Sequence, residues 1–266
     1  MTELQPYLVC ATQRSGSTLL VESLAATGVA GQPAEFFQYF ASSSLAPQPR
    51  EWFVGVGDDE IVGRLSQSDP GEVDARGAEQ WRDDVVAAGA TENGVWGGKL
   101  MWNQTPLLVA RTRVASGELR ASLRWLLGSD PLFVHVYRDD LVGQAVSMWR
   151  AVQTRIWREG SVEHSEGVPD EEAFYSAEGI AHLARILADQ EQRWRGWFAE
   201  QHIEPIEIEF GELTKDPTGT TARVLSALGQ DPALAPPPPI KPQSNTRSKE
   251  WALRYRADAD RNGYPR

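Results

Sequence analysis

The residues best able to do chemistry lie in one short loop near the N-terminus of this 266-residue chain. The loop carries a guanidinium at Arg14 and hydroxyls at Ser15, Ser17 and Thr18, with Gly16 among them. An apolar stretch precedes it and apolar residues at helical spacing follow it, so it joins a strand to the start of a helix. The first N–H groups of a helix have no partner within the helix, and the helix dipole adds positive charge there. The loop therefore predicts a binding site for a phosphate-like anion.

This loop differs from the two common nucleotide-binding loops. It has one glycine and no lysine, and its basic residue precedes the glycine, whereas a Walker loop reads G-x-x-x-x-G-K-[ST]. A Rossmann loop needs three glycines in the pattern G-x-G-x-x-G. The pattern argues against an ordinary ATPase or GTPase and against a dinucleotide-binding protein. The alternative is a Ser/Gly turn that only caps a structural helix.

A second basic residue is expected at the same edge of the sheet. Arg138 directly follows the apolar run 132–137, so it projects from the carboxyl edge, where ligands bind in open α/β folds. Ser147 lies on the helix that follows. The alternatives are a surface Arg138 paired with Asp139 or Asp140, and a Ser147 that merely faces a neighbouring helix.

Glu35 is the candidate proton acceptor. It follows Gly31-Gln32-Pro33, one helix beyond the loop, so the chain can return it to the same edge. A carboxylate placed there can take a proton from a hydroxyl group. The alternatives are that Glu35 is a favourable charge at a helix N-terminus, or that His135 is the base, although a histidine inside an apolar strand is more often a core residue. The sequence shows no metal-ligand spacing, so no catalytic metal is predicted.

The hydrophobic pattern supplies the elements that must position these residues. Four apolar runs predict strands, and helical periodicity follows each of them. This alternation predicts a single α/β domain with a mainly parallel sheet flanked by helices. The fourth run alternates in polarity, so it is expected near the sheet edge. The expected strands are 7–11, 95–101, 132–137 and 205–210, and the expected helices are 18–26, 104–114, 141–152, 177–201 and 218–228.

Composition narrows the class of protein. A net charge of −11 disfavours a nucleic-acid binder, and an anionic ligand must then be held by local arginines. Cys10 is the single cysteine, so no internal disulfide forms, which suits a reducing cytoplasm. The sequence has no signal-peptide pattern and no apolar run of roughly 20 residues, so a cytoplasmic protein without membrane insertion is expected.

The loop resembles the 5′-phosphosulfate loop of sulfotransferases that use 3′-phosphoadenylyl sulfate (PAPS), in which Lys or Arg precedes a Ser/Thr-Gly-[ST]-[ST] turn. Longer blocks along nearly the whole chain resemble the trehalose 2-sulfotransferases of mycolic-acid bacteria. The blocks are 30–39, 47–53, 94–104, 144–147 and 149–155. The resemblance implies a P-loop-like sulfotransferase domain over 1–266, with 240–266 covering the donor or packing on the domain. It also implies a homodimer.

The resemblance further implies a donor site for PAPS, with adenosine 3′,5′-bisphosphate (PAP) as product and no metal. Arg14 and the N–H groups of residues 15–18 would hold the phosphosulfate and stabilise the leaving oxygen. The residues implied for the 3′-phosphate are Arg138, Ser147, Arg247 and Ser248. The separation of Arg138 from Ser147 is one residue longer than is usual in the family. The alternative for the C-terminal pair is a solvated amphipathic helix.

On the acceptor side, the resemblance implies transfer to the 2-hydroxyl of trehalose with Glu35 as base, and a place in carbohydrate metabolism and sulfolipid biosynthesis. Lys99 is a candidate donor to the leaving group or to the acceptor. The implied acceptor-binding residues are Gln13, Gln32, Pro33, Glu35, Phe36, Phe37, Gln38, Pro47, Trp52 and Lys99. Three alternatives remain: a sulfotransferase for another small carbohydrate, a kinase with a degenerate phosphate loop, and a non-catalytic sugar- or nucleotide-binding protein.

Overall fold

The computed structural model describes residues 4–37, 52–56, 59–65, 74–157, 168–238 and 246–266. The chain divides into two compact units. The first unit comprises residues 1–46, 71–138 and 190–241, and the second comprises 47–70, 139–189 and 242–266. Each unit has its own core and is described by itself.

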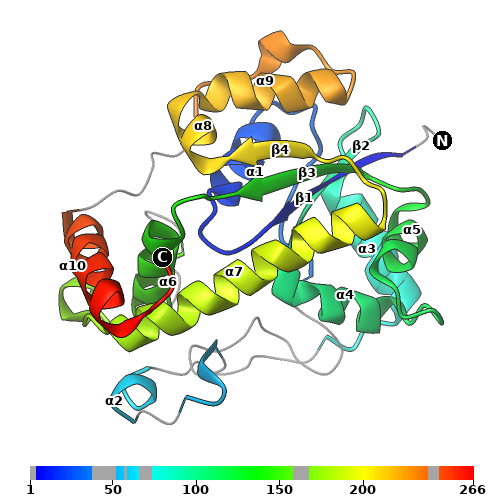
Figure 1. Ribbon diagram of the computed structural model, residues 1–266. Coiled ribbons are helices and arrows are strands. Elements are labelled where there is room, and N and C mark those ends of the chain that lie inside the picture. The colour runs from blue at the N-terminus through cyan, green and yellow to red at the C-terminus, as the bar shows by residue number, and fades with distance from the viewer. Residues whose placement is uncertain (1–3, 38–51, 57–58, 66–73, 158–167, 239–245) are drawn as a thin grey trace. The chain divides into compact units, whose positions relative to one another are not determined.

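The first unit is built on a four-stranded sheet in the order β2-β1-β3-β4 (Figure 1). The strands are β1 (Gln5–Ala11), β2 (Val95–Met101), β3 (Leu132–Tyr137) and β4 (Ile206–Glu209). All neighbouring strands are parallel, and Ala11 lies opposite both Met101 and Val136. The residues that follow these strands therefore start at one common edge, where ligands bind in parallel sheets.

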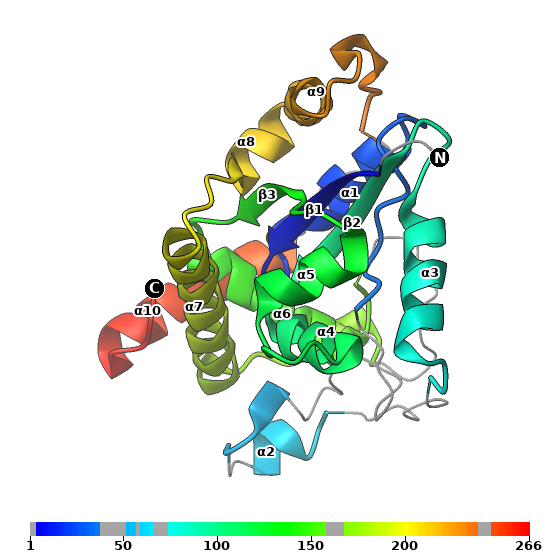
Figure 2. The same ribbon diagram turned by 90° about the vertical axis from the view of Figure 1, so that its right-hand side faces the viewer.

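Helices cover both faces of this sheet because side chains alternate along each buried strand. Tyr7, Val9 and Ala11 pack with α1 (Ser17–Ala25), α8 (Phe210–Lys215) and α9 (Pro217–Ala227). Leu8 and Cys10 face the other way, towards the helices that Figure 2 shows on the α3, α4 and α5 side of the sheet. That face is covered by α3 (Ala78–Gly89), α4 (Thr105–Thr112), α5 (Leu119–Leu127) and the C-terminal half of α7 (Ala177–Glu200). Two short 3₁₀ helices, η2 (Trp102–Gln104) and η4 (Pro232–Leu234), complete the first unit.

The second unit is helical in its described part. It contains α2 (Asp59–Val62), α6 (Leu141–Thr154), η3 (Asp170–Glu172), the N-terminal half of α7 and α10 (Thr246–Asn262). Its core joins Trp149 and Val152 of α6, Ile180 of α7 and Tyr255 of α10, all fully buried. Across the described residues, no helix combines the length and the apolarity needed to cross a bilayer.

The predicted parallel sheet flanked by helices is confirmed. The four strands lie where the apolar runs placed them, within two residues at each end, and β4 is at the edge as expected. The five predicted helices are present, but α3, α5 and α8 were not predicted. Only Trp81, Val85 and Gly89 of α3 are buried, so its apolar pattern is weak. The single domain over 1–266 stays a prediction.

Candidate functional site

The predicted phosphate loop joins β1 to α1 at the carboxyl edge of the sheet. Gly16 is the N-cap of α1 with φ of 90°, a left-handed conformation that glycine adopts without strain. Arg14 has φ of 62°, which is uncommon for a residue with a side chain and frequent at functional sites. No described side chain caps α1. The loop therefore presents the N-terminal N–H groups of α1 in the way an anion site requires.

The hydroxyl groups of the loop lie in different surroundings. The side chains of Ser15 and Ser17 are buried, and within the described part of the chain the Ser15 hydroxyl has no hydrogen-bond partner. Thr18 is partly exposed, and its Oγ1 accepts a hydrogen bond of 3.1 Å from Lys99 Nζ. Thr18 thus links the loop to the neighbouring strand β2.

Glu35 lies at the same edge, beside Lys99. Gly31, with φ of 70°, lets the chain pass against β2, because a Cβ there would come within 2.5 Å of the Gly97 nitrogen. The Ala34 carbonyl then accepts a 2.9 Å hydrogen bond from the Lys99 backbone N–H. Lys99 is nearly fully buried, and its Nζ is 2.6 Å from Glu35 Oε1. The structure therefore brings together Thr18, Glu35 and Lys99, which sequence reasoning named separately.

Gln104 belongs to this group, although sequence reasoning did not single it out. Its Nε2 donates a 3.0 Å hydrogen bond to Glu35 Oε2. The ammonium of Lys99 on one oxygen and the Gln104 amide on the other favour the ionised carboxylate, the form that a proton acceptor needs. The signal that was available is the position of Gln104 just beyond the carboxyl end of a predicted strand.

Gln13 lies at this edge as well. Its Nε2 donates to Asn103 Oδ1 at 2.5 Å, and both residues follow strands that pair through Ala11 and Met101. Gln32 is exposed, Pro33 is buried, and Phe37 is buried in the core against Trp81. Gln38 and Pro47 lie outside the described residues.

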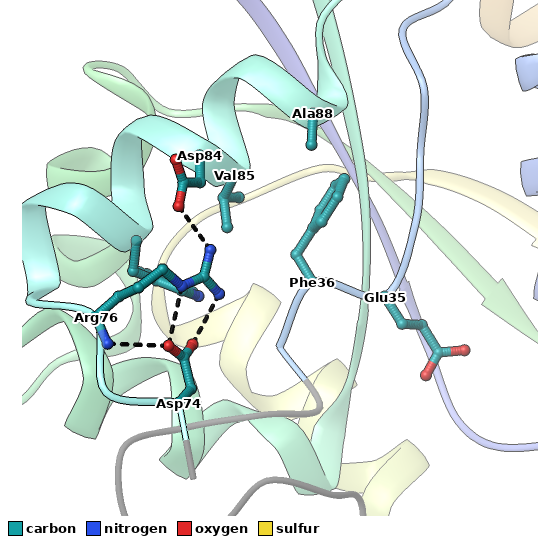
Figure 3. A pocket seen from close by; sticks show the side chains of 8 residues that line it. Glu35, Phe36, Asp74, Arg76, Asp84, Val85 and Ala88 are labelled. Atoms are coloured by element: carbon teal, nitrogen blue, oxygen red, sulfur yellow. Dashed lines mark hydrogen bonds and ion pairs between the residues drawn. The ribbon is translucent and has the colours of Figure 1, made fainter. Parts of the chain in front are cut away.

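A cavity of about 390 Å³ opens next to Glu35 (Figure 3). Phe36, Trp81, Val85 and Ala88 form apolar walls, and Asp74, Arg76 and Asp84 supply charge. Figure 3 shows Phe36 between the cluster around Arg76 and Glu35, whose carboxylate points away from that cluster. An aromatic wall with charged groups is the composition expected of a site for a polar ring compound. The cavity residues that lie on α3 or just before it were not predicted from the sequence.

Arg76 holds the charged side of this cavity in place. Its guanidinium donates to Asp74 Oδ1 at 2.9 Å and Oδ2 at 2.8 Å, and to Asp84 Oδ2 at 2.7 Å. Arg111, which is buried, lies 3.3 Å from Asp74 Oδ2. Hydrogen bonds from Arg76 lower the pKa of Asp74 to about 2. The Asp74 carboxylate is therefore ionised at neutral pH.

Arg138 lies at the end of β3, as predicted, and contacts the aromatic ring of Phe210. Its guanidinium carbon is 4.3 Å from the ring centroid. The same ring packs on the phosphate loop, because a Cβ at Gly16 would come within 2.7 Å of Phe210 Cδ2. Phe210 thus ties Arg138 to the phosphate loop within the first unit.

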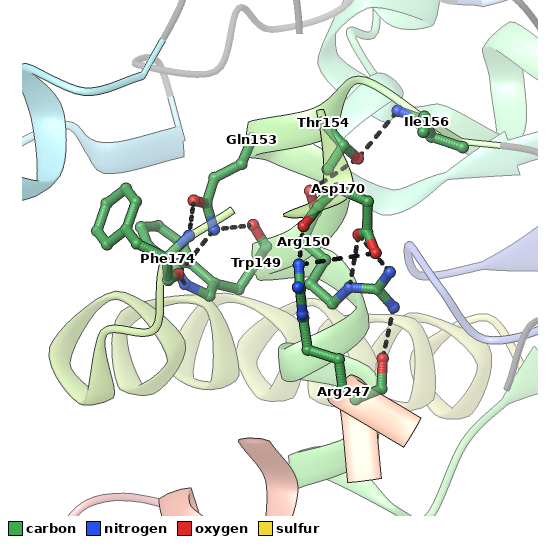
Figure 4. A network of polar contacts seen from close by, with 9 residues as sticks. Trp149, Arg150, Gln153, Thr154, Ile156, Asp170, Phe174 and Arg247 are labelled. Carbon is green, nitrogen blue, oxygen red and sulfur yellow. Dashed lines mark hydrogen bonds and ion pairs between the residues drawn. The ribbon is translucent and has the colours of Figure 1, made fainter. Parts of the chain in front are cut away.

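The remaining predicted residues belong to the second unit. Ser147 is partly exposed on α6, and Trp52 packs in the core of this unit. The two residues from the C-terminal segment, Arg247 and Ser248, lie in the first turn of α10. They join a polar network that sequence reasoning did not foresee (Figure 4).

This network is centred on Asp170. Arg150 Nη2 donates to Asp170 Oδ1 at 2.5 Å, and Arg150 Nη1 donates to Ser248 Oγ at 2.6 Å. Arg247 donates to the Asp170 carbonyl, and its Nη1 lies 3.8 Å from Asp170 Oδ2. Two guanidinium groups therefore lie within ion-pair distance of a single carboxylate, as they would of an anionic ligand, and the Ser248 hydroxyl accepts a hydrogen bond from one of them.

The rival base, His135, is fully buried in β3. Its Nε2 is 3.3 Å from Glu191 Oε2, and its ring stacks on Tyr137 at 5.5 Å. This environment is that of a core histidine. Among the described residues, no group of three or more His, Cys, Asp or Glu side chains is placed to hold a metal ion.

Known proteins resemble this chain over nearly its whole length. It is 55% identical over 266 residues to a trehalose 2-sulfotransferase of Mycobacterium tuberculosis (strain ATCC 35801 / TMC 107 / Erdman), covering 98% of each chain. It is 53% identical over 264 residues to a trehalose 2-sulfotransferase of Mycolicibacterium smegmatis (strain ATCC 700084 / mc(2)155), covering 97% of each chain.

Two further comparisons differ in strength. The sulfotransferase domain of the Synechococcus PCC 7002 olefin synthase is 13% identical over 96% of each chain with a TM-score of 0.37, a likeness too weak to bear on the fold. The sequence profile of the Stf0 sulphotransferase family matches residues 6–258. On this match and on the identity to its two relatives, the chain belongs to the Stf0 sulphotransferase family and is a sulfotransferase.

Proposed function

We propose that this sulfotransferase transfers the sulfuryl group of PAPS to the 2-hydroxyl of α,α-trehalose, which gives trehalose 2-sulfate and PAP. The observation that carries the proposal is the identity above 50% to two trehalose 2-sulfotransferases over nearly the whole chain. Such identity makes a shared acceptor the simplest expectation, whereas membership of the family alone would leave the acceptor open.

The transfer is an in-line displacement at sulfur. The acceptor oxygen forms a new S–O bond while the bond from sulfur to the phosphate oxygen breaks, and that oxygen leaves with the electron pair. By analogy with phosphoryl transfer, positioning and electrostatic stabilisation supply most of the rate enhancement. Glu35 takes the hydroxyl proton as the new bond forms. The two donors on its carboxylate support this role, because they favour the form that accepts a proton.

The donor is proposed to bind at the phosphate loop. Arg14 and the N–H groups of residues 15–18 hold the phosphosulfate, and Arg14 stabilises the charge that develops on the leaving oxygen. Lys99 Nζ, which is hydrogen-bonded to Thr18, is close enough to the loop to add a further charge. Arg138, Ser147, Arg247 and Ser248 remain the predicted residues for the 3′-phosphate.

The acceptor is proposed to use the cavity beside Glu35. Phe36 offers an apolar face for a sugar ring, and the carboxylates of Asp74 and Asp84 accept hydrogen bonds from hydroxyl groups. The other acceptor-side residues named from the sequence, the homodimer, the cytoplasmic location and the metal independence stay predictions.

The test is to incubate the purified protein with sulfur-labelled PAPS and trehalose in the presence of a metal chelator. Label in a disaccharide whose NMR spectrum places the sulfate at the 2-position is the expected result. If the protein sulfated another sugar but not trehalose, it would still be a carbohydrate sulfotransferase, and the proposal that trehalose is the acceptor would be wrong. Magnesium-dependent use of ATP would instead favour the kinase alternative, and binding of ligands without any transfer would favour a non-catalytic protein.

A further inference from the structure

Gln104 uses both ends of its side-chain amide in contacts next to Glu35. It is 3% exposed and ends η2, directly after β2. Its Oε1 accepts a hydrogen bond of 3.1 Å from the Met101 N–H, and its Nε2 donates to Glu35 Oε2 at 3.0 Å. The amide therefore bridges the end of the strand and the carboxylate.

The orientation of this amide follows from chemistry. A backbone N–H can only donate, so the group that faces Met101 must be the amide oxygen. The NH₂ group must then face Glu35. One carboxylate oxygen thus meets an uncharged donor, and the other meets the Lys99 ammonium at 2.6 Å.

The backbone before Glu35 is attached to the same stretch of chain. The Lys99 N–H donates to the Ala34 carbonyl at 2.9 Å, and Ala34 pairs with Gly98 in a parallel bridge. Residues 98–104 therefore fix both the backbone that leads to Glu35 and its two carboxylate oxygens. A glutamate side chain without such contacts would exchange among several rotamers.

We propose that Gln104 is a positioning residue that holds Glu35 in the orientation from which it accepts the proton. This inference rests on the proposed function, in which Glu35 is the base. Lys99 supplies charge to the carboxylate, whereas Gln104 supplies direction without charge. A displacement of about 1 Å in a reacting group can cost about 10²-fold in rate, so the loss of this contact is expected to lower turnover substantially.

The variant Gln104→Glu separates this role from simple capping of the turn. A glutamate at 104 keeps an oxygen that can accept from the Met101 N–H, and it replaces the donor to Glu35 with a second carboxylate oxygen. Among the charged groups of the described residues, Lys99 from β2 contacts Glu35, whereas Asp74, Arg76 and Asp84 line the same cavity on the far side of Phe36. The new negative charge favours protonated Glu35.

The expected result for Gln104→Glu is a fall in kcat of about 10²-fold at neutral pH, with an unchanged KM for PAPS. The acidic limb of the pH–rate profile moves to higher pH. If Gln104 only caps the turn, Gln104→Glu behaves as the wild type does, whereas Gln104→Leu, which removes both contacts, lowers the melting temperature. That pattern would overturn the inference.

A double-mutant cycle tests whether Gln104 acts through Glu35. We expect the double variant Glu35→Gln/Gln104→Glu to have the same kcat as Glu35→Gln alone, since the base is already lost. If the fold-losses in kcat of the two single variants multiplied in the double variant, Gln104 would act independently of Glu35, which contradicts the proposal.

A second readout does not depend on the acceptor. In protein with carbon-labelled glutamate carboxyls, NMR follows the Glu35 resonance, identified by its loss in Glu35→Gln. The resonance is expected to titrate at higher pH in Gln104→Glu than in the wild type. Failure of the wild type to sulfate trehalose would overturn the proposed function and leave this result standing, whereas an unchanged Glu35 titration would overturn the inference about Gln104.

Discussion

At the scale of single residues, the site depends on how one carboxylate is held. Glu35 has a cation on one oxygen and an amide on the other, and Lys99 shares its ammonium with the hydroxyl of Thr18 in the phosphate loop. The same buried lysine therefore contacts the proposed base and the proposed donor loop. In the proposed reaction, the charge that builds up on the leaving oxygen at this loop lies within reach of Lys99.

Replacing Glu35 by glutamine tests the proposed base. Glu35→Gln keeps the size of the side chain and removes its ability to take a proton, so kcat for sulfuryl transfer is expected to fall by about 10²–10⁴-fold. Affinity for PAP, measured by calorimetry, should stay the same because no donor contact is removed. Glu200→Gln, at the exposed end of α7, is the matched control and should retain full activity. An equal loss of PAP affinity would assign Glu35 a structural role.

At the scale of elements, the carboxyl ends of β1, β2 and β3 bring the groups together. β1 leads into the phosphate loop, β2 carries Lys99 and ends before Gln104, and β3 ends before Arg138. Phe210, the first residue of α8, packs against Gly16 and lies under the Arg138 guanidinium. The loop is therefore shaped by an element that follows the fourth strand.

The variant Gly16→Ala tests this packing. The added Cβ would lie 2.7 Å from Phe210 Cδ2, at a φ of 90° that alanine avoids. We expect the loop to shift, and the KM for PAPS to rise by at least about 10-fold. Gly28→Ala provides the control, since Gly28 has φ of 72° with nothing within 4 Å of a Cβ. It imposes similar strain away from the loop and should leave KM unchanged. An equal rise in the KM for PAPS in Gly16→Ala and Gly28→Ala would count against a specific role for the geometry of the loop.

At the scale of the whole molecule, acidic side chains paired with arginines make stability depend on pH. In the first unit, Asp74 pairs with Arg76 and Arg111, and Asp130 pairs with Arg120 and Arg124. Hydrogen bonds from arginine lower the pKa of both carboxyls, that of Asp74 to about 2. An unpaired aspartate has a pKa of about 4. Their stabilisation is therefore complete above about pH 4 and is lost as the pH falls towards 2.

Urea unfolding at a series of pH values tests this contribution with the variant Asp74→Asn. At pH 7 the variant should lose about 1–3 kcal/mol of unfolding free energy, because the buried guanidinium of Arg111 loses its carboxylate. The difference from the wild type should shrink between pH 4 and pH 2, as Asp74 becomes protonated in the wild type. Asp83→Asn, on the exposed face of α3, should show no such difference. If the difference in unfolding free energy between Asp74→Asn and the wild type stayed constant down to pH 2, the pH dependence would not come from Asp74.

Local patterns in the sequence were enough to predict the strands and several residues of the candidate site. The apolar runs predicted the strands because a buried parallel strand needs a nearly continuous apolar stretch. The loop around Gly16 and the position of Arg138 after β3 were predictable because residues that follow parallel strands share one edge. Glu35 was named for the same reason, together with the resemblance of its neighbours to a family.

Other contacts depend on segments that lie far apart in the chain. Gln104 and Glu35 are separated by 69 residues, and Gln13 and Asn103 by 90. The helix α3 brings Trp81 and Asp84 to the cavity although few of its residues are buried, so its apolar pattern was too weak to predict it. In the second unit, the pairing of Arg150 with Asp170 and Ser248 likewise has no local signal.

The sequence by itself determined the strands, the loop that joins β1 to α1, the two arginines that follow strands and the family resemblance. All of these are properties of short contiguous segments, whose hydrophobic period and turn residues act locally. Only the tertiary structure decided that Lys99 and Gln104 share the Glu35 carboxylate and that Phe210 joins Arg138 to the loop. The register of β1 against β2 and β3 places these side chains, and that register is set by packing on both faces of the sheet rather than by any one segment.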